Sequence, residues 1–126
     1  TDHPEVLQRR IPVRALSLNG ENTLVATVYD LMLGNYGIDR GLGGEHVASS
    51  FDDDVPYTPA WQEAITGVPR NKVITTAREF ADNADKTEGR SMVILGAGLN
   101  HWYHMDMAYR GIINMLMMCG CIGKSG

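Results

Sequence analysis

Apolar residues interleaved with polar ones form two strand-like stretches near the start of the chain, residues 13–18 and 23–28. Residues Asn19 to Asn22 separate them, and an Asn-Gly pair between two such stretches is typical of a β-hairpin. The pattern therefore predicts a hairpin with a four-residue loop. The apolar run that follows, Tyr29 to Tyr36, predicts a short helix with Asp30 as its N-cap.

Residues 37–56 are rich in glycine and aspartate and poor in large apolar groups, which predicts a long loop. Loops of this length in a compact domain are usually functional or mobile. A helix is expected directly after it, because Thr58 offers a capping hydroxyl and Pro59 suits the first helical position. This helix should run to about Thr66 and stop at Gly67.

A second helix is predicted from Pro69, with its exit turn at Asp85–Gly89. Its apolar residues recur at spacings of three and four and so share one face: Val73, Ile74, Ala77, Phe80, Ala81 and Ala84. The continuous apolar run Ser91–Leu95, between Arg90 and Gly96, suits a strand that is buried on both faces, as in parallel sheets.

The last predicted helix, residues 107–119, has hardly any polar face, which predicts burial on all sides. The rest of this chain is too small to cover it. Because the chain also starts without Met and stops inside an apolar stretch, we expect a piece of a longer polypeptide. The apolar run from Gly111 to Gly126 is interrupted by Asn114 and by glycines, and is shorter than the ~20 residues of a membrane span.

The fold class expected from these elements is α/β: an N-terminal hairpin, helices, and a buried strand that leads into a glycine-rich turn and an apolar helix. With 126 residues, 44% hydrophobic and 21% charged, the chain fits one globular domain. The 11 basic and 15 acidic residues give a formal charge of −4 and no dense basic run, which argues against a nucleic-acid binder and a polybasic membrane contact. Two cysteines cannot form a disulfide scaffold, which favours a reducing compartment.

The most informative chemistry lies where the predicted strand ends, at Gly96 and Gly98. Glycines there allow the backbone to approach a phosphate or a heteroaromatic ring. A dinucleotide fingerprint would need a third glycine where His101 stands, so an ordinary NAD site is not favoured, and a simple tight turn is the alternative. Asn100 and His101 supply hydrogen-bond donors, so the residues from Gly96 to His104 are interpreted as a cradle for a polar ligand.

Other residues with metal-binding chemistry favour plainer interpretations. His101 and His104 with Cys119 and Cys121 do not have a familiar zinc spacing, and the cysteines suit small buried hydrophobes. The acidic run Asp52–Asp54 lacks the alternating ligands of a calcium loop and is interpreted as a solvated turn. No residue of the chain is assigned a catalytic or metal-ligating role.

Several stretches of the chain resemble the catalytic alpha subunits of respiratory nitrate reductases, which belong to the molybdopterin oxidoreductases of the DMSO reductase type. The resemblance extends over the whole chain and is most specific from Gly96 to Gly111. The broader family shares an Ile-Thr-Gly-Val helix pair, a strand that ends in glycines and a glycine-rich closing segment. The stretches that carry the resemblance are Tyr57–Trp61, Ile65–Val68, Ala77–Thr87, Gly96–His104 and the glycine-rich closing segment from Leu116 to Gly126.

This resemblance implies a fragment of an α/β/α domain from a large bacterial enzyme that reduces nitrate to nitrite in anaerobic respiration or nitrate assimilation. The parent enzyme would use molybdenum held by two molybdopterin guanine dinucleotides and a [4Fe-4S] cluster. Electrons from quinol would arrive through an iron-sulfur beta subunit and a haem-containing membrane gamma subunit, at the cytoplasmic face of the membrane. The isolated fragment is expected to be inactive and free of cofactor. The resemblance assigns cofactor contact to Gly96, Gly98, Leu99, Asn100, His101 and Trp102.

We therefore expect a single partial domain over residues 1–126, with a hairpin and helix at 1–36, a loop at 37–56 and a cofactor-binding segment at 57–126. The alternatives are a free-standing nucleotide-binding or protein-interaction module of the α/β class, and a small metal-binding protein. Self-association of the fragment through its apolar last helix is also expected, since exposed apolar surface seeks partners.

Overall fold

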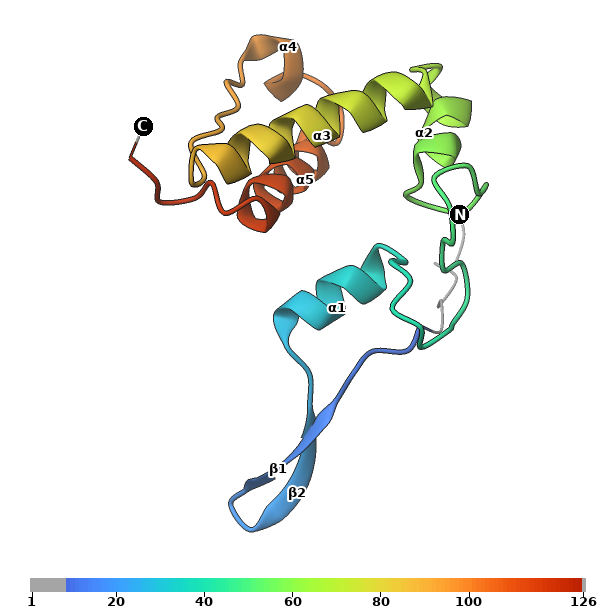
Figure 1. Cartoon of the computed structure of the whole chain (residues 1–126), viewed down its shortest axis with the longest axis vertical. Coiled ribbons are helices and arrows are strands. Elements are labelled where there is room, and N and C mark those ends of the chain that lie inside the picture. The colour runs from blue at the N-terminus through green and yellow to red at the C-terminus, as the bar shows by residue number, and fades with distance from the viewer. Residues whose placement is uncertain (1–8, 126) are drawn as a thin grey trace. The chain divides into compact units, whose positions relative to one another are not determined.

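The computed structural model describes residues 9–125, which form one two-stranded sheet and five helices (Figure 1). Two parts of the chain lie outside the described residues. They are the first eight residues, which belong to the predicted 1–36 segment, and Gly126 at the end of the glycine-rich closing segment. The chain divides into two compact units, Thr1–Asn71 and Lys72–Gly126. The expected mixed α/β class is confirmed. In chain order the elements are β1 (Arg14–Leu18), β2 (Glu21–Val25), α1 (Val28–Asn35), α2 (Pro59–Thr66), α3 (Arg70–Lys86), α4 (Ala97–Asn100) and α5 (Met105–Met118).

Strands β1 and β2 form the predicted hairpin, in which Leu18 pairs with Glu21. The turn is therefore Asn19-Gly20 alone, and the predicted four-residue loop is wrong. Asn19 and Gly20 both have positive φ, at 53° and 86°, as the tight turns that suit the twist of a hairpin require. Glu21 and Asn22, which were expected in the loop, consequently belong to β2, and this strand ends at Val25.

Helix α1 begins one residue earlier than predicted, and its N-cap is Thr27, so the prediction of Asp30 as the cap is wrong. The backbone N–H of Asp30 donates to Thr27 Oγ1 at 3.0 Å, while the Thr27 hydroxyl donates to the Asp30 carboxylate at 2.6 Å. Thr27 and Asp30 thus cap the helix reciprocally, as in a capping box. At the other end, the Arg9 guanidinium donates to the carbonyl oxygens of Gly34, at 3.0 Å, and Asn35.

The predicted start and end of α2 are confirmed. The N-cap is Thr58, whose hydroxyl accepts a hydrogen bond from the Trp61 N–H at 3.1 Å, and Pro59 is the first helical residue. Gly67 ends the helix in the left-handed conformation, at φ 70°. Residues 37–56 form the predicted long loop, which contains isolated bridge pairings but no helix or strand.

Helix α3 starts directly after Pro69, as predicted, and an extended segment runs back along it from Ser91. The Ser91 hydroxyl donates to the Phe80 carbonyl oxygen at 3.2 Å and accepts from Asn83 Nδ2 at 2.7 Å. The buried strand predicted at Ser91–Leu95 is not formed, because among residues 9–125 no strand pairs with it. Exposure alternates along this segment: Met92 is 76% and Ile94 85% accessible, whereas Val93 and Leu95 are half-buried.

Helix α5 is apolar, as predicted, but none of its residues is buried by the part of the chain that the structure describes. The prediction of burial on all sides is therefore wrong for the described residues, which leave one face of this helix half-buried and the other exposed. The exposed apolar side chains of α5 are Met107, Ile113, Met117 and Met118. Within the described residues, no helix combines the length and apolarity needed to cross a membrane. The expected self-association through α5 stays a prediction.

The exit turns of α3 and α5 meet at two glycines. Gly89 has φ +91°, and a Cβ built on it would lie 2.2 Å from the carbonyl oxygen of Gly120. Both the backbone conformation and the close approach therefore require glycine at position 89. Gly120 also has a positive φ, +65°, but a Cβ there would meet no atom within 4 Å.

Substituting Gly89 with alanine should destabilise the second unit more than the same change at Gly120. Gly120→Ala introduces only backbone strain, about 1–2 kcal/mol for a left-handed residue. Gly89→Ala adds a clash with a backbone oxygen and should lower the free energy of unfolding by more than that. Urea unfolding followed by circular dichroism measures both variants. Equal losses would show that the contact between the two turns contributes nothing.

Candidate functional site

The six residues assigned to cofactor contact lie together on one short turn. Gly96 is the N-cap of α4, and its carbonyl oxygen accepts hydrogen bonds from the N–H groups of Leu99, at 2.9 Å, and Asn100, at 3.2 Å. Leu99 is half-buried, whereas Asn100, His101 and the other members of the set are exposed. Trp102 is 72% accessible. The turn thus presents its polar and aromatic groups outward.

The two glycines of this turn are not required by the chain's own structure. Gly96 has an extended backbone, φ −151°, that any residue adopts, and Gly98 lies inside α4. A Cβ at either position would meet no atom within 4 Å. Glycine inside a helix costs about 0.5–1 kcal/mol relative to alanine. The backbone at Gly96 and Gly98 is therefore accessible beside the exposed side chains of Asn100 and His101.

The residues considered for metal binding do not converge. His101 follows α4 and His104 precedes α5 with φ 58°, so the two are not on one helix. No three His, Cys, Asp or Glu side chains between residues 9 and 125 are placed to hold a metal ion. Cys119 and Cys121 are free, half-buried thiols, and burial raises the pKa of Cys119 above its ordinary value. A neutral thiol is the poorer metal ligand, which favours the interpretation of the cysteines as small hydrophobes.

Sequence reasoning missed a cavity of about 530 Å³ in the first unit. It is lined by Tyr36, Ile38 and Asp39, by residues 48–51 and by residues 57–59. The length of the 37–56 loop was the one available signal, because the lining residues come from three separate stretches within residues 36–59.

Aromatic rings contact one another at this cavity. The ring of Tyr57 meets Tyr36 edge-on, with centroids 5.6 Å apart, and also contacts Trp61, which lies outside the cavity lining, at 5.7 Å. Tyr57 adopts φ 75°, a left-handed conformation that costs a side-chain-bearing residue about 1–2 kcal/mol. The residue with the strained backbone, Tyr57, is therefore the one whose ring contacts both of the others.

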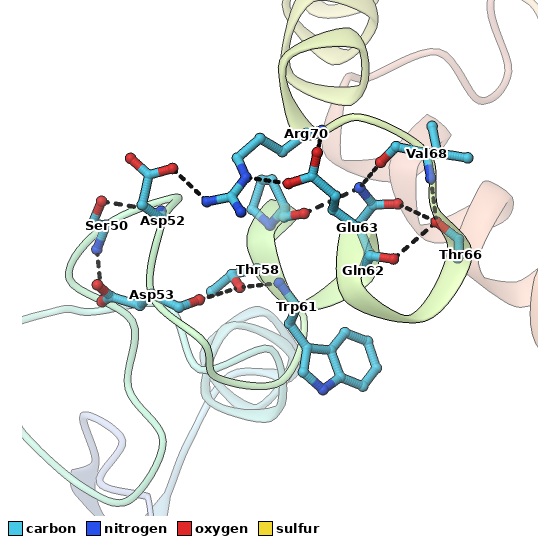
Figure 2. Close-up of polar contacts among 11 residues, drawn as sticks. Ser50, Asp52, Asp53, Thr58, Trp61, Gln62, Glu63, Thr66, Val68 and Arg70 are labelled. Carbon is cyan, nitrogen blue, oxygen red and sulfur yellow. Dashed lines mark hydrogen bonds and ion pairs between the residues drawn. The ribbon is translucent and has the colours of Figure 1, made fainter.

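A capped turn forms the polar part of the cavity wall (Figure 2). Asp53 Oδ2 accepts hydrogen bonds from the N–H groups of Ser49, at 2.7 Å, and Ser50, at 3.0 Å. The Thr58 hydroxyl donates to the Asp53 carbonyl oxygen at 2.6 Å and so joins this turn to the start of α2. The indole of Trp61 points away from these polar contacts (Figure 2).

Arg70 closes the network from the start of α3. Its Nη1 donates to Asp52 Oδ1 at 2.8 Å, and its Nε donates to the Glu63 carboxylate (Figure 2). These hydrogen bonds from Arg70 lower the pKa of Glu63 below its ordinary value. The pKa of Asp53 is likewise lowered by the hydrogen bonds from Ser49 and Ser50. Two carboxylates of the acidic turn, Asp52 and Asp53, are thus engaged by the protein's own donors.

Comparison with known proteins gives a consistent family. The model of the molybdopterin oxidoreductase family matches residues 13–126. The chain is 63% identical over 122 residues, 96% of its length, to the respiratory nitrate reductase 1 alpha chain of Escherichia coli (strain K12). It is 50% identical over 125 residues, 99% of its length, to the nitrate reductase alpha chain of Bacillus subtilis (strain 168). A perchlorate reductase alpha subunit from Dechloromonas aromatica (strain RCB) is 38% identical over 69 residues, covering 55% of this chain and 7% of that subunit.

The relatives are much longer than this chain. The matched residues span 10% of the Escherichia coli alpha chain and 10% of the Bacillus subtilis chain. The similarity therefore relates this chain to one small region of each relative.

The lowered pKa values predict acid sensitivity of the first unit. A carboxyl group whose pKa is lowered on folding contributes stability above its unfolded pKa, near 4, and this contribution is lost as pH falls through the folded value. The melting temperature should therefore fall when pH decreases from about 6 to about 3. Asp53→Asn should flatten this dependence, whereas Asp54→Asn, a matched change in the same turn, should keep it. An identical pH profile for Asp53→Asn and the unmodified chain would contradict the assignment.

Proposed function

The chain belongs to the molybdopterin oxidoreductase family, and from this premise we propose that it forms part of the catalytic alpha subunit of a respiratory nitrate reductase. The observation that carries the proposal is the identity of 50–63% with two nitrate reductase alpha chains over nearly all of its length. The perchlorate reductase subunit is less similar and matches little more than half of the chain. Nitrate is therefore the proposed substrate of the parent enzyme, and nitrite its product.

The role proposed for this chain is to form part of the wall around the molybdenum bis(molybdopterin guanine dinucleotide). When bound, that cofactor supplies the redox chemistry for the reduction of nitrate. The residues proposed to contact it are Gly96, Gly98, Leu99, Asn100, His101 and Trp102.

Each part of the turn has a distinct task in this proposal. The backbone at Gly96 and Gly98, free of side chains, allows a bulky planar group to come close. The exposed side chains of Asn100 and His101 donate hydrogen bonds to its polar atoms. The exposed indole of Trp102 offers a flat apolar surface to a heteroaromatic ring. Leu99 is half-buried and anchors the turn to the protein.

Further features of the parent enzyme are proposed on the same ground. They are a [4Fe-4S] cluster, electron delivery from quinol through an iron-sulfur beta subunit and a haem-containing gamma subunit, and a place at the cytoplasmic face of the bacterial membrane. No residue of this chain is proposed as a ligand of molybdenum or of the cluster. The isolated chain should consequently bind no cofactor and reduce no nitrate.

The substitution Gly98→Ala in the complete alpha subunit should separate cofactor binding from stability. A methyl group at position 98 has free space in the chain itself, so the isolated chain should keep or gain up to about 1 kcal/mol of stability. In the assembled enzyme the same methyl group would meet the cofactor, and molybdenum content per subunit should fall several-fold.

The matched control for this experiment is Gly111→Ala. Gly111 lies in α5, also without a neighbour within 4 Å of its Cβ position. This variant should keep its molybdenum content. Full molybdenum content in Gly98→Ala would refute a close approach of the cofactor at this glycine.

Replacing His101 with alanine in the complete enzyme should lower cofactor occupancy or nitrate turnover, because a hydrogen-bond donor to the dinucleotide is lost. Molybdenum analysis and nitrite formation measure the two quantities. Unchanged values of both would remove His101 from the contact set.

A further inference from the structure

The cavity in the first unit lies in the acidic part of the chain. Residues 36–59, which contain all of its lining residues, carry five acidic side chains and one arginine. The remaining residues carry ten acidic and ten basic side chains, so this stretch accounts for the whole formal charge of −4. Its one arginine, Arg40, is paired with Asp30. Of the other acidic side chains in this stretch, Asp52 is paired with Arg70. Asp39 alone is charged among the described residues that line the cavity, and its carboxylate favours a positively charged occupant.

Asp39 brings a carboxylate to the cavity lining. Its Oδ1 accepts a hydrogen bond from the N–H of Gly41 at 2.8 Å, which fixes the orientation of the side chain. Among the described residues no donor reaches its other oxygen, Oδ2. A ligand that enters the cavity can thus donate to a carboxylate that is already in place.

The other walls of the cavity suit the same kind of ligand. Tyr36, Phe51 and Tyr57 line it with aromatic rings, and Tyr57, which has the strained backbone conformation, contacts both Tyr36 and Trp61 with its ring. Backbone strain of this kind persists where the surroundings enforce it, often at ligand sites. Aromatic faces attract cations, and a planar guanidinium both stacks on a ring and donates to a carboxylate.

We propose that this cavity binds an arginine side chain from a basic segment of a partner polypeptide, with the guanidinium between the aromatic rings and the Asp39 carboxylate. The volume, about 530 Å³, exceeds that of one side chain and leaves room for flanking residues of the segment. Anionic ligands such as nucleotides are disfavoured by the Asp39 carboxylate. The inference does not depend on the cofactor contacts proposed for residues 96–102.

The test uses the full chain and the peptide acetyl-Gly-Arg-Arg-Gly-amide, titrated by NMR at low ionic strength. A second peptide with citrulline in place of arginine has nearly the same shape without the charge. The arginine peptide should shift resonances of the cavity residues and saturate, and the citrulline peptide should bind at least fivefold more weakly. Equal affinity for the two peptides would overturn the proposal.

Two substitutions and one matched control locate the binding. Asp39→Asn keeps an oxygen to accept from Gly41 but removes the charge, and should weaken binding at least fivefold. Tyr57→Asn removes the ring while Asn tolerates positive φ, and should have a similar effect. Asp54→Asn makes the same charge change outside the cavity lining and should alter affinity less than twofold. Equal losses in Asp39→Asn and Asp54→Asn would indicate general attraction to an acidic surface and would refute a site at Asp39.

Discussion

Hydrogen bonds from side chains to helix ends and turns hold the described part of the chain together. Its buried apolar side chains are few and mostly small: Leu33, Ala60 and Ala84. Thr27 and Thr58 fix the starts of α1 and α2, and Asp53 fixes the turn before α2. A cap of this kind contributes about 1 kcal/mol, and without a large core these contributions decide which local structure forms.

The two candidate sites use this framework in different ways. Loop residues line most of the cavity in the first unit. Hydrogen bonds from Thr58 to Asp53 and from Arg70 to Asp52 fix the position of this loop relative to α2. The turn from Gly96 to Trp102 instead exposes its backbone and polar groups. It follows an extended segment that is hydrogen-bonded to α3 through Ser91. The extended segment and α5 leave apolar side chains accessible.

Local signals determined which elements could be predicted. Helix α2 was predicted to the residue because Thr58, Pro59 and Gly67 each act within the helix itself. Two plausible caps three residues apart, Thr27 and Asp30, led to an error because both take part in the same capping box. The strand at Ser91–Leu95 requires a partner that no local pattern supplies. The cavity was missed for a similar reason, since its lining comes from three separate stretches. The candidate cofactor residues came from a resemblance alone, because no local pattern of the sequence assigns a ligand to residues 96–102, and they stay a prediction.

The capping bonds have a consequence for the order in which this chain acquires structure. They join residues three to five positions apart, and the two-residue hairpin turn is equally local. Helices and hairpins of this kind form in roughly 0.1–10 μs, whereas a ribosome adds about 5–20 residues per second. The hairpin and the capped helices can therefore form and unfold thousands of times before the next amino acid is added. These elements can thus reach their local structure while the rest of the chain is still being synthesised.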